Sequence, residues 1–158
     1  MQFSVTSQPI ASLNTGTIIV AIPESLKLGP QASQLDQACS GAIQRLLDNG
    51  DFQGKAGQCL LLQPVQGCNA GRILLVGSGK EQPDLKTLRK LIGAVTNQLK
   101  TLGSNQATMV LENLVAKQQT TAASAGLIAR HLAECLYVFD AYKSEKAPSS
   151  KFDNLEFL

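Results

Sequence analysis

The chain has 158 residues, of which 44% are hydrophobic and 16% are charged, and its formal net charge is +2 at pH 7. This length suits one globular domain with a sizeable core, and so small a charge gives no independent reason to expect a nucleic-acid partner. No apolar run approaches the roughly 20 residues that cross a membrane, and the N-terminus lacks the basic and apolar regions of a secretory signal. We therefore expect a cytoplasmic protein with no membrane contact.

The first half of the chain predicts two strands followed by a long helix. Residues 2–7 alternate between polar and apolar side chains, and residues 17–22 form a β-branched run that is typical of a strand covered on both faces. Ser33 is a candidate N-cap for a helix that reaches about Asn49, because the apolar side chains between them recur every three or four residues. Gly50 follows as a residue that enters the left-handed conformation without steric cost.

The second half predicts three strands, two helices and a last strand-like segment. The strands fall at residues 58–63, 72–77 and 107–114, the helices at residues 83–102 and 121–139, and the last segment at residues 153–158. Each helix is expected to bury one apolar face, made of Leu85, Leu88, Ile92, Val95, Leu99 and Leu102 on the first and Leu127, Ile128, Leu132, Cys135, Leu136 and Phe139 on the second. Strands interleaved with amphipathic helices predict an α/β fold, in which helices cover both faces of a mostly parallel or mixed sheet.

Residues 71–81, GRILLVGSGKE, pass from an apolar run to glycine, serine and lysine, as phosphate-binding loops do. The P-loop pattern fails, because leucine replaces its first glycine and Glu81 stands where serine or threonine should follow Lys80. The dinucleotide-binding pattern lacks its third glycine, and the nucleophile-elbow pattern of hydrolases lacks the glycines that should flank its serine. We therefore predict that Gly77 and Gly79 let the chain turn sharply out of a central strand.

The side chains that most often carry chemistry are scattered along the chain. The four cysteines, Cys39, Cys59, Cys68 and Cys135, form no Cys-x-x-Cys pair, and we interpret them as buried thiols of a reducing cytosol. His131 lies four residues before Cys135, but a zinc site needs three or four ligands and no others lie near in sequence. The residues themselves therefore indicate no catalytic and no metal-binding side chain in this chain.

Lys86, Arg89 and Lys90 form a basic patch with i, i+3, i+4 spacing on the helix predicted to follow GRILLVGSGKE. Such a patch, together with Arg45 and Lys100, could contact the phosphates of DNA. It is also the ordinary solvated face of an amphipathic helix, and no aromatic side chains are interleaved with it as single-strand binding would favour. Both interpretations stay open at this point.

Several segments in a fixed order resemble the N-terminal domain of the leucyl (cytosol) aminopeptidases, a family of two-domain, two-metal exopeptidases. They are MQFSV at residues 1–5, QLDQACSGAIQRLLDNGDFQGKAGQCLLL at residues 34–62, and GRILLVGSGKE. The resemblance implies a macro-domain-like fold with three α/β/α layers and a mixed central sheet. It also implies a domain at residues 1–142, followed at residues 143–158 by a linker and an exit strand toward a C-terminal catalytic domain that the chain lacks.

The resemblance places the family's chemistry outside this chain. In the family, Asp, Glu and Lys side chains of the C-terminal domain hold two divalent ions, manganese or zinc, which activate a bridging water. The acidic signature Asn-Thr-Asp-Ala-Glu-Gly-Arg of that domain is absent from the 158 residues, so no catalytic or metal residue is carried over. The resemblance implies a non-catalytic assembly and regulatory domain of a homohexameric leucyl aminopeptidase, whose substrates are peptides with a preferred N-terminal leucine. The fragment alone is expected to be inactive.

Two other functions compete with this expectation. A stand-alone macro-type module would bind ADP-ribose, but the glycine-rich diphosphate loops of such modules are missing here, and a fold does not fix a function. A DNA-binding accessory domain, a role that some bacterial relatives have, would use Lys86, Arg89 and Lys90, and its affinity would fall as the salt concentration rises.

Overall fold

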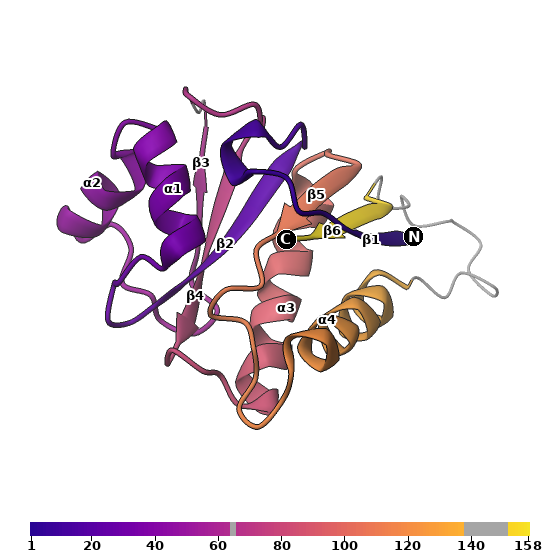
Figure 1. Cartoon of the computed structure of the whole chain (residues 1–158). Helices are drawn as coiled ribbons and strands as arrows, with labels where there is room; N and C mark the ends of the chain where they lie inside the picture. The colour runs from indigo at the N-terminus through magenta and orange to yellow at the C-terminus, as the bar shows by residue number, and fades with distance from the viewer. Residues whose placement is uncertain (64–65, 138–151) are drawn as a thin grey trace.

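The computed structural model describes residues 1–63, 66–137 and 152–158, with a six-stranded sheet at its centre. The strands are β1 (Gln2–Val5), β2 (Thr17–Pro23), β3 (Cys59–Leu62), β4 (Ile73–Gly79), β5 (Gln106–Met109) and β6 (Asn154–Phe157). The helices are α1 (Pro30–Ala38), α2 (Ala42–Asp48), α3 (Leu85–Thr101) and α4 (Thr121–Leu136), with a short 3-10 helix, η1, at Ile10–Ser12. α1 and α2 cover one face of the sheet and α3 and α4 the other (Figure 1). The predicted three-layer α/β/α fold is confirmed.

The sheet is mixed, and its strands lie in the order β1-β6-β5-β2-β4-β3. Every neighbouring pair is parallel except β3 and β4, which are antiparallel. The last predicted strand is confirmed as β6, which lies between β1 and β5 and joins the first strand to the rest of the sheet. The helix end expected at Phe139 and the domain boundary expected between residues 142 and 143 lie outside the described residues.

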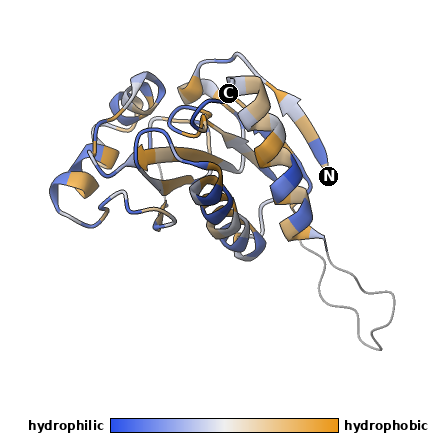
Figure 2. Cartoon of the chain, turned by 90° about the horizontal axis from the view of Figure 1, so that it is seen from below, coloured by the Kyte–Doolittle hydropathy of each residue, from blue (hydrophilic) through white to orange (hydrophobic). Residues whose placement is uncertain are grey.

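The central strands β2 and β4 form the middle of the core, and every residue in both is buried. Side chains alternate between the two faces of a strand, so Ile19 and Ala21 pack with α3 and α4, whereas Ile18, Val20 and Ile22 pack with α1 and α2. Figure 2 shows these hydrophobic strands flanked by helices that carry both hydrophilic and hydrophobic residues. The prediction of a strand covered on both faces is confirmed.

The single helix predicted from Ser33 to Asn49 is wrong, because the chain forms two shorter helices there. α1 begins at Pro30, whose fixed φ and missing N–H suit the first position of a helix, and its N-cap is Gly29. At the far end of α2, Gly50 has a φ of 77°, which confirms the predicted left-handed helix end.

The break between α1 and α2 is built by Ser40 and Gly41, which take left-handed φ values of 57° and 75°. Asp36 then supports the new helix, because its Oδ1 accepts hydrogen bonds from the backbone N–H groups of Ile43 at 2.8 Å and Gln44 at 3.1 Å. Backbone donors at the start of a helix have no partner within the helix, so this carboxylate stabilises the start of α2.

α3 and α4 lie close to their predicted ranges, and both begin at a side-chain cap. Asp84 Oδ1 accepts from Thr87 N–H at 2.7 Å, and Thr120 Oγ1 accepts from Ala123 N–H at 3.1 Å. Gly103 follows α3 with a φ of 61°, as expected of a residue that closes a helix. Within the described ranges, no helix is both long and apolar enough to span a bilayer.

The cap at Asp84 predicts a pH-dependent contribution to stability. Hydrogen bonds from Thr87 hold the pKa of the Asp84 carboxyl below its usual range, and Lys117 and Lys80 add smaller effects in the same direction. The folded-state pKa is then lower than the unfolded value of about 4, so the charge stabilises the fold above that value and stops doing so as the pH falls through the folded pKa. We expect Asp84→Asn to lower the Tm at neutral pH and to change it little in strong acid, as followed by circular dichroism.

The matched control for this experiment is Asp51→Asn, which removes an exposed aspartate that caps no helix. We expect the Tm of this variant to differ little from that of the wild type at either pH. The same loss of Tm for Asp84→Asn at both pH values would contradict the prediction, because it would show that the charge of Asp84 plays no part.

Candidate functional site

The turn at the end of β4 is shaped by the close approach of residues 49–58, which join α2 to β3 and are called the connector below. The Gly77 N–H donates to the Gln58 carbonyl at 2.7 Å, and the Gly57 N–H donates to the Gly77 carbonyl at 3.0 Å. A Cβ atom on Gly77 would overlap the connector's backbone, at 2.6 Å from the carbonyl carbon of Gly54. Gly79 ends the strand with a φ of 73°. The glycines therefore serve a turn out of a central strand, as predicted, and the chain's own backbone fills the space beside Gly77.

The N-terminus of α1 is occupied by an anion that the chain supplies itself. Glu112, in the segment after β5, accepts a hydrogen bond through Oε2 from the Ala32 N–H at 3.3 Å. The carboxylate is packed so closely that a Cβ atom on Gly29 would lie 2.7 Å from this same oxygen. Helix N-termini attract negative charge and often hold phosphate groups at the carboxyl edge of an α/β sheet. Glu112 therefore takes a position where a phosphate would otherwise be favoured.

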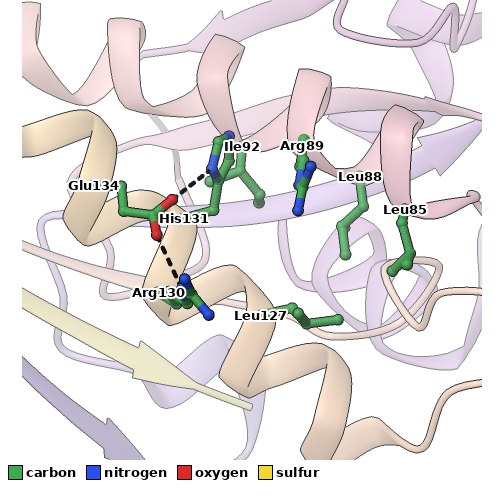
Figure 3. A pocket seen from close by; sticks show the side chains of 8 residues that line it. All are labelled: Leu85, Leu88, Arg89, Ile92, Leu127, Arg130, His131 and Glu134. Carbon is green, nitrogen blue, oxygen red and sulfur yellow. Dashed lines mark hydrogen bonds and ion pairs between the residues drawn. The ribbon is translucent and has the colours of Figure 1, made fainter.

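A groove of about 310 Å³ lies between α3 and α4, on the face of the sheet opposite to α1 and α2. Figure 3 shows its lining side chains, which are Leu85, Leu88, Arg89 and Ile92 from α3 and Leu127, Arg130, His131 and Glu134 from α4. The expectation that Leu85 and Leu127 are buried is wrong, because their exposed fractions are 47% and 37%. Both belong to the apolar stripes of their helices but lie at the edges that face the groove, whereas Leu88 and Ile92 are buried beneath them.

Three polar side chains of the groove, Arg130, His131 and Glu134, are paired with one another along α4. Arg130 Nε lies 2.9 Å from Glu134 Oε1, and His131 Nδ1 lies 3.5 Å from Glu134 Oε2. The hydrogen bond from Arg130, followed by the one from His131, lowers the pKa of the Glu134 carboxyl. His131 Nε2 also lies 3.7 Å from Cys135 Sγ, so these two residues share a helix face, as the spacing indicated. In the part of the chain that the structure describes, no three His, Cys, Asp or Glu side chains are placed to hold a metal ion.

The basic patch of Lys86, Arg89 and Lys90 is exposed on α3, but its members face different surroundings. Arg89 lines the groove toward α4, whereas the alkyl chain of Lys90 lies beside the connector, 3.3 Å from where a Cβ atom on Gly57 would be. DNA contact at this patch stays a prediction. Binding of DNA at this patch would weaken as the salt concentration rises, and more steeply the more phosphates the patch contacts.

Comparison with known protein families and curated sequences points to one family. Residues 19–146 match the model of the cytosol aminopeptidase family, N-terminal domain. The chain is 43% identical over 159 aligned positions to the cytosol aminopeptidase of Pseudomonas aeruginosa strain PAO1, and 40% identical to the probable cytosol aminopeptidase of Azotobacter vinelandii. Both alignments cover 100% of this chain and 32% of the relative. The chain therefore spans about a third of the length of these curated relatives.

Solved structures with a similar fold fall into two groups. A tomato leucine aminopeptidase mutant superposes with a TM-score of 0.78 at 18% identity, over 99% of this chain and 32% of that one. A Trypanosoma brucei macrodomain in complex with ADP-ribose superposes with a TM-score of 0.72 at 15% identity, over 98% of this chain and 62% of that one. These likenesses confirm the macro-domain-like fold, and the sequence matches decide between the two groups: the chain belongs to the cytosol aminopeptidase family, whose N-terminal domain it represents.

Proposed function

We propose that this chain is the non-catalytic assembly and regulatory domain of a leucyl aminopeptidase, a metal-dependent exopeptidase that releases N-terminal amino acids, preferably leucine, from peptides. One observation carries the proposal: the whole chain aligns at 43% identity with only 32% of a protein named cytosol aminopeptidase. The remainder of such a protein is then the catalytic domain, and it is the first partner of this chain.

The carboxylates of this chain support a scaffold role. Hydrolysis by two metal ions needs several carboxylates that converge on shared ions. Three carboxylates of the described residues cap helices instead, Asp36 at α2, Asp84 at α3 and Glu112 at α1. We therefore propose that the two divalent ions, manganese or zinc, and the peptide substrate bind to the C-terminal domain.

We further propose that the full-length protein is a cytoplasmic homohexamer, and that this domain contributes to its assembly. The name cytosol aminopeptidase, which the relatives share, supports the location. The groove between α3 and α4 supports a role in assembly, because exposed leucines such as Leu85 and Leu127 are typical of surfaces that contact another domain or subunit.

Binding of ADP-ribose is the alternative that the fold favours, since a macrodomain in complex with this ligand superposes on the chain. A fold alone does not determine a function, and two features of this chain oppose the alternative. The Glu112 carboxylate already occupies the N-terminus of α1, and the backbone of the connector closes the space beside Gly77. A diphosphate bound at the N-terminus of α1 would have to displace Glu112, so we favour the aminopeptidase domain.

A chimera tests the proposal. Residues 1–158 replace the matching N-terminal part of the Pseudomonas aeruginosa cytosol aminopeptidase, whose identity to this chain is 43%. We expect the chimera to assemble as a hexamer by light scattering and to hydrolyse leucine p-nitroanilide with added manganese. We expect the purified chain alone to hydrolyse nothing above the buffer rate, with manganese or with zinc, because the catalytic centre belongs to the other domain.

The matched control is a second chimera that carries the Trypanosoma brucei macrodomain, which has the same fold at 15% identity. This chimera is expected to lose assembly, because it keeps the fold but not the surfaces of the family. Equal assembly and activity in both chimeras would count against a specific role of this domain. Hydrolysis by the isolated chain that a chelator abolishes would overturn the assignment of the metals to the other domain.

A further inference from the structure

Cys39 and Cys68 come together at the C-terminal end of α1, although they are far apart in sequence. Cys39 is the C-cap of α1 and is buried. Cys68 lies in the loop between β3 and β4, half-buried against the same hydrophobic cluster. The loop runs against the helix end at this point, because a Cβ atom on Gly67 would lie 2.8 Å from the carbonyl carbon of Ala38 and 3.5 Å from the Cα of Cys39.

The Cys68 thiol lies near enough to Cys39 to affect its ionisation. Burial raises the pKa of the Cys39 thiol to about 12, and the neighbouring Cys68 thiol is the next cause, ahead of the Asp36 carboxylate. The other two cysteines lie elsewhere. Cys59, on β3, packs against the cluster on the opposite face of the sheet, and Cys135, on α4, has its Sγ beside the ring of a histidine.

Hydrogen bonds hold the backbone at Cys39 and at the residue next to Cys68. The Cys39 N–H donates to the Leu35 carbonyl at 3.0 Å. The Asn69 N–H donates to the Ala11 carbonyl at 3.2 Å, so the residue after Cys68 is fixed to η1. A disulfide needs Cα atoms about 4.4–6.8 Å apart, and Gly67, the residue before Cys68, packs directly against the backbone of Ala38 and Cys39.

We propose that Cys39 and Cys68 form a reversible disulfide when the domain meets a low-molecular-weight disulfide such as oxidised glutathione. In reducing conditions both remain free thiols, as they are in the structure. The bond ties the loop between β3 and β4 to the end of α1, and it closes a covalent ring that contains α2 and β3. The pair is thus a redox modification site on the face of the sheet away from the α3–α4 groove.

The reaction takes place in two exchange steps. The more accessible thiol, Cys68, attacks one sulfur of oxidised glutathione as its thiolate, which breaks that S–S bond and releases one glutathione. The Cys39 thiol then loses its proton to solvent, and its sulfur attacks the Cys68 sulfur and releases the second glutathione. Two protein thiols are oxidised, one oxidised glutathione is reduced to two thiols, and the protein's two protons balance the two glutathione thiolates. The high pKa of Cys39 makes the second step the slower one, because only the thiolate is nucleophilic.

The test is a redox titration of the folded chain in mixtures of reduced and oxidised glutathione. Free thiols are trapped by alkylation, and the peptides are mapped by mass spectrometry without reduction. We expect one cross-linked peptide pair, joining Cys39 to Cys68, whose amount rises with the oxidised fraction and disappears when reduced glutathione is restored. The oxidised protein should melt about 5 °C or more above the reduced one, because a cross-link over a loop of this kind restricts the unfolded chain.

Variants of the same chain separate the proposal from non-specific oxidation. Cys39→Ser should stop at a glutathione adduct on Cys68, Cys68→Ser should form no cross-link, and both should lose the rise in Tm. A double variant, Cys59→Ser with Cys135→Ser, should behave as the wild type. A wild-type protein that accumulates glutathione adducts without a cross-link, or that links another pair of cysteines, would overturn the proposal.

Discussion

Replacing Phe52 with alanine is expected to lower the free energy of unfolding by about 3–5 kcal/mol. Phe52 has an exposed fraction of 0% and is among the largest fully buried side chains of the described residues. It lies in the connector between α2 and β3 and fills the core between the sheet and the α1–α2 layer. Truncation to alanine removes apolar burial and leaves a cavity, and both effects destabilise the fold. Urea unfolding followed by far-UV circular dichroism measures the change.

Phe3→Ala is the matched control for the Phe52 variant. Phe3 is 40% exposed and makes a stacked contact with Phe157, at 6.3 Å between ring centroids. Losing this contact should cost about 1 kcal/mol, because no cavity forms in the core. An equal loss of stability in both variants would contradict the prediction, because it would show that the buried Phe52 contributes no more to the core than the exposed Phe3.

Gly77→Ala is expected to destabilise the domain by about 3 kcal/mol, at the upper end of the range for overpacking. The added Cβ atom would meet backbone atoms of the connector, among them the carbonyl carbon of Gly54 at 2.6 Å and its oxygen at 2.8 Å. These backbone atoms cannot rotate away from the new Cβ atom as a flexible side chain could. The connector is also held in place by the hydrogen bond from the Gly77 N–H to the Gln58 carbonyl and by the one from the Gly79 N–H to the Gly54 carbonyl at 2.9 Å. The variant should therefore unfold at clearly lower urea concentrations than the wild type.

Gly93→Ala makes the same chemical change in a place where the structure has room for it. Gly93 lies inside α3, and a Cβ atom there would meet nothing within 4 Å. We expect this variant to be more stable than the wild type by about 1 kcal/mol, because alanine favours a helix over glycine. Opposite signs for the two glycine variants are the expected result. A Gly77→Ala protein as stable as the wild type would show that the connector does not lie against β4.

The parts of the fold that the sequence predicted well are those that short-range periodicity determines. The β-branched run of β2 and the apolar stripe of α3 each carry a pattern that neighbouring residues repeat several times. The break between α1 and α2 was missed because the apolar stripe continues across it. Only the conformations of Ser40 and Gly41 and the cap from Asp36 reveal it.

The candidate sites were harder to predict, because they depend on contacts between distant residues. The hydrogen bond from Ala32 to Glu112 joins residues 80 positions apart, and neither residue stands out in the sequence. The pairing of Cys39 with Cys68 depends on how the loop after β3 folds back. The exposure of Leu85 and Leu127 depends on how α3 and α4 lie beside each other. The family, in contrast, was visible from short segments whose order and spacing match a known domain.

The position of β6 constrains when this domain can finish folding during synthesis. Gln2 is in register with Asn154, and Val5 with Phe157, so the edge strand β1 can pair only after β6 has been made. The ribosome covers the most recent residues of a growing polypeptide, and the sheet therefore stays incomplete until β6 has emerged from it. β1 therefore has no partner strand while β2 to β5 are made, and its pairing with β6 is a late step in the folding of this domain.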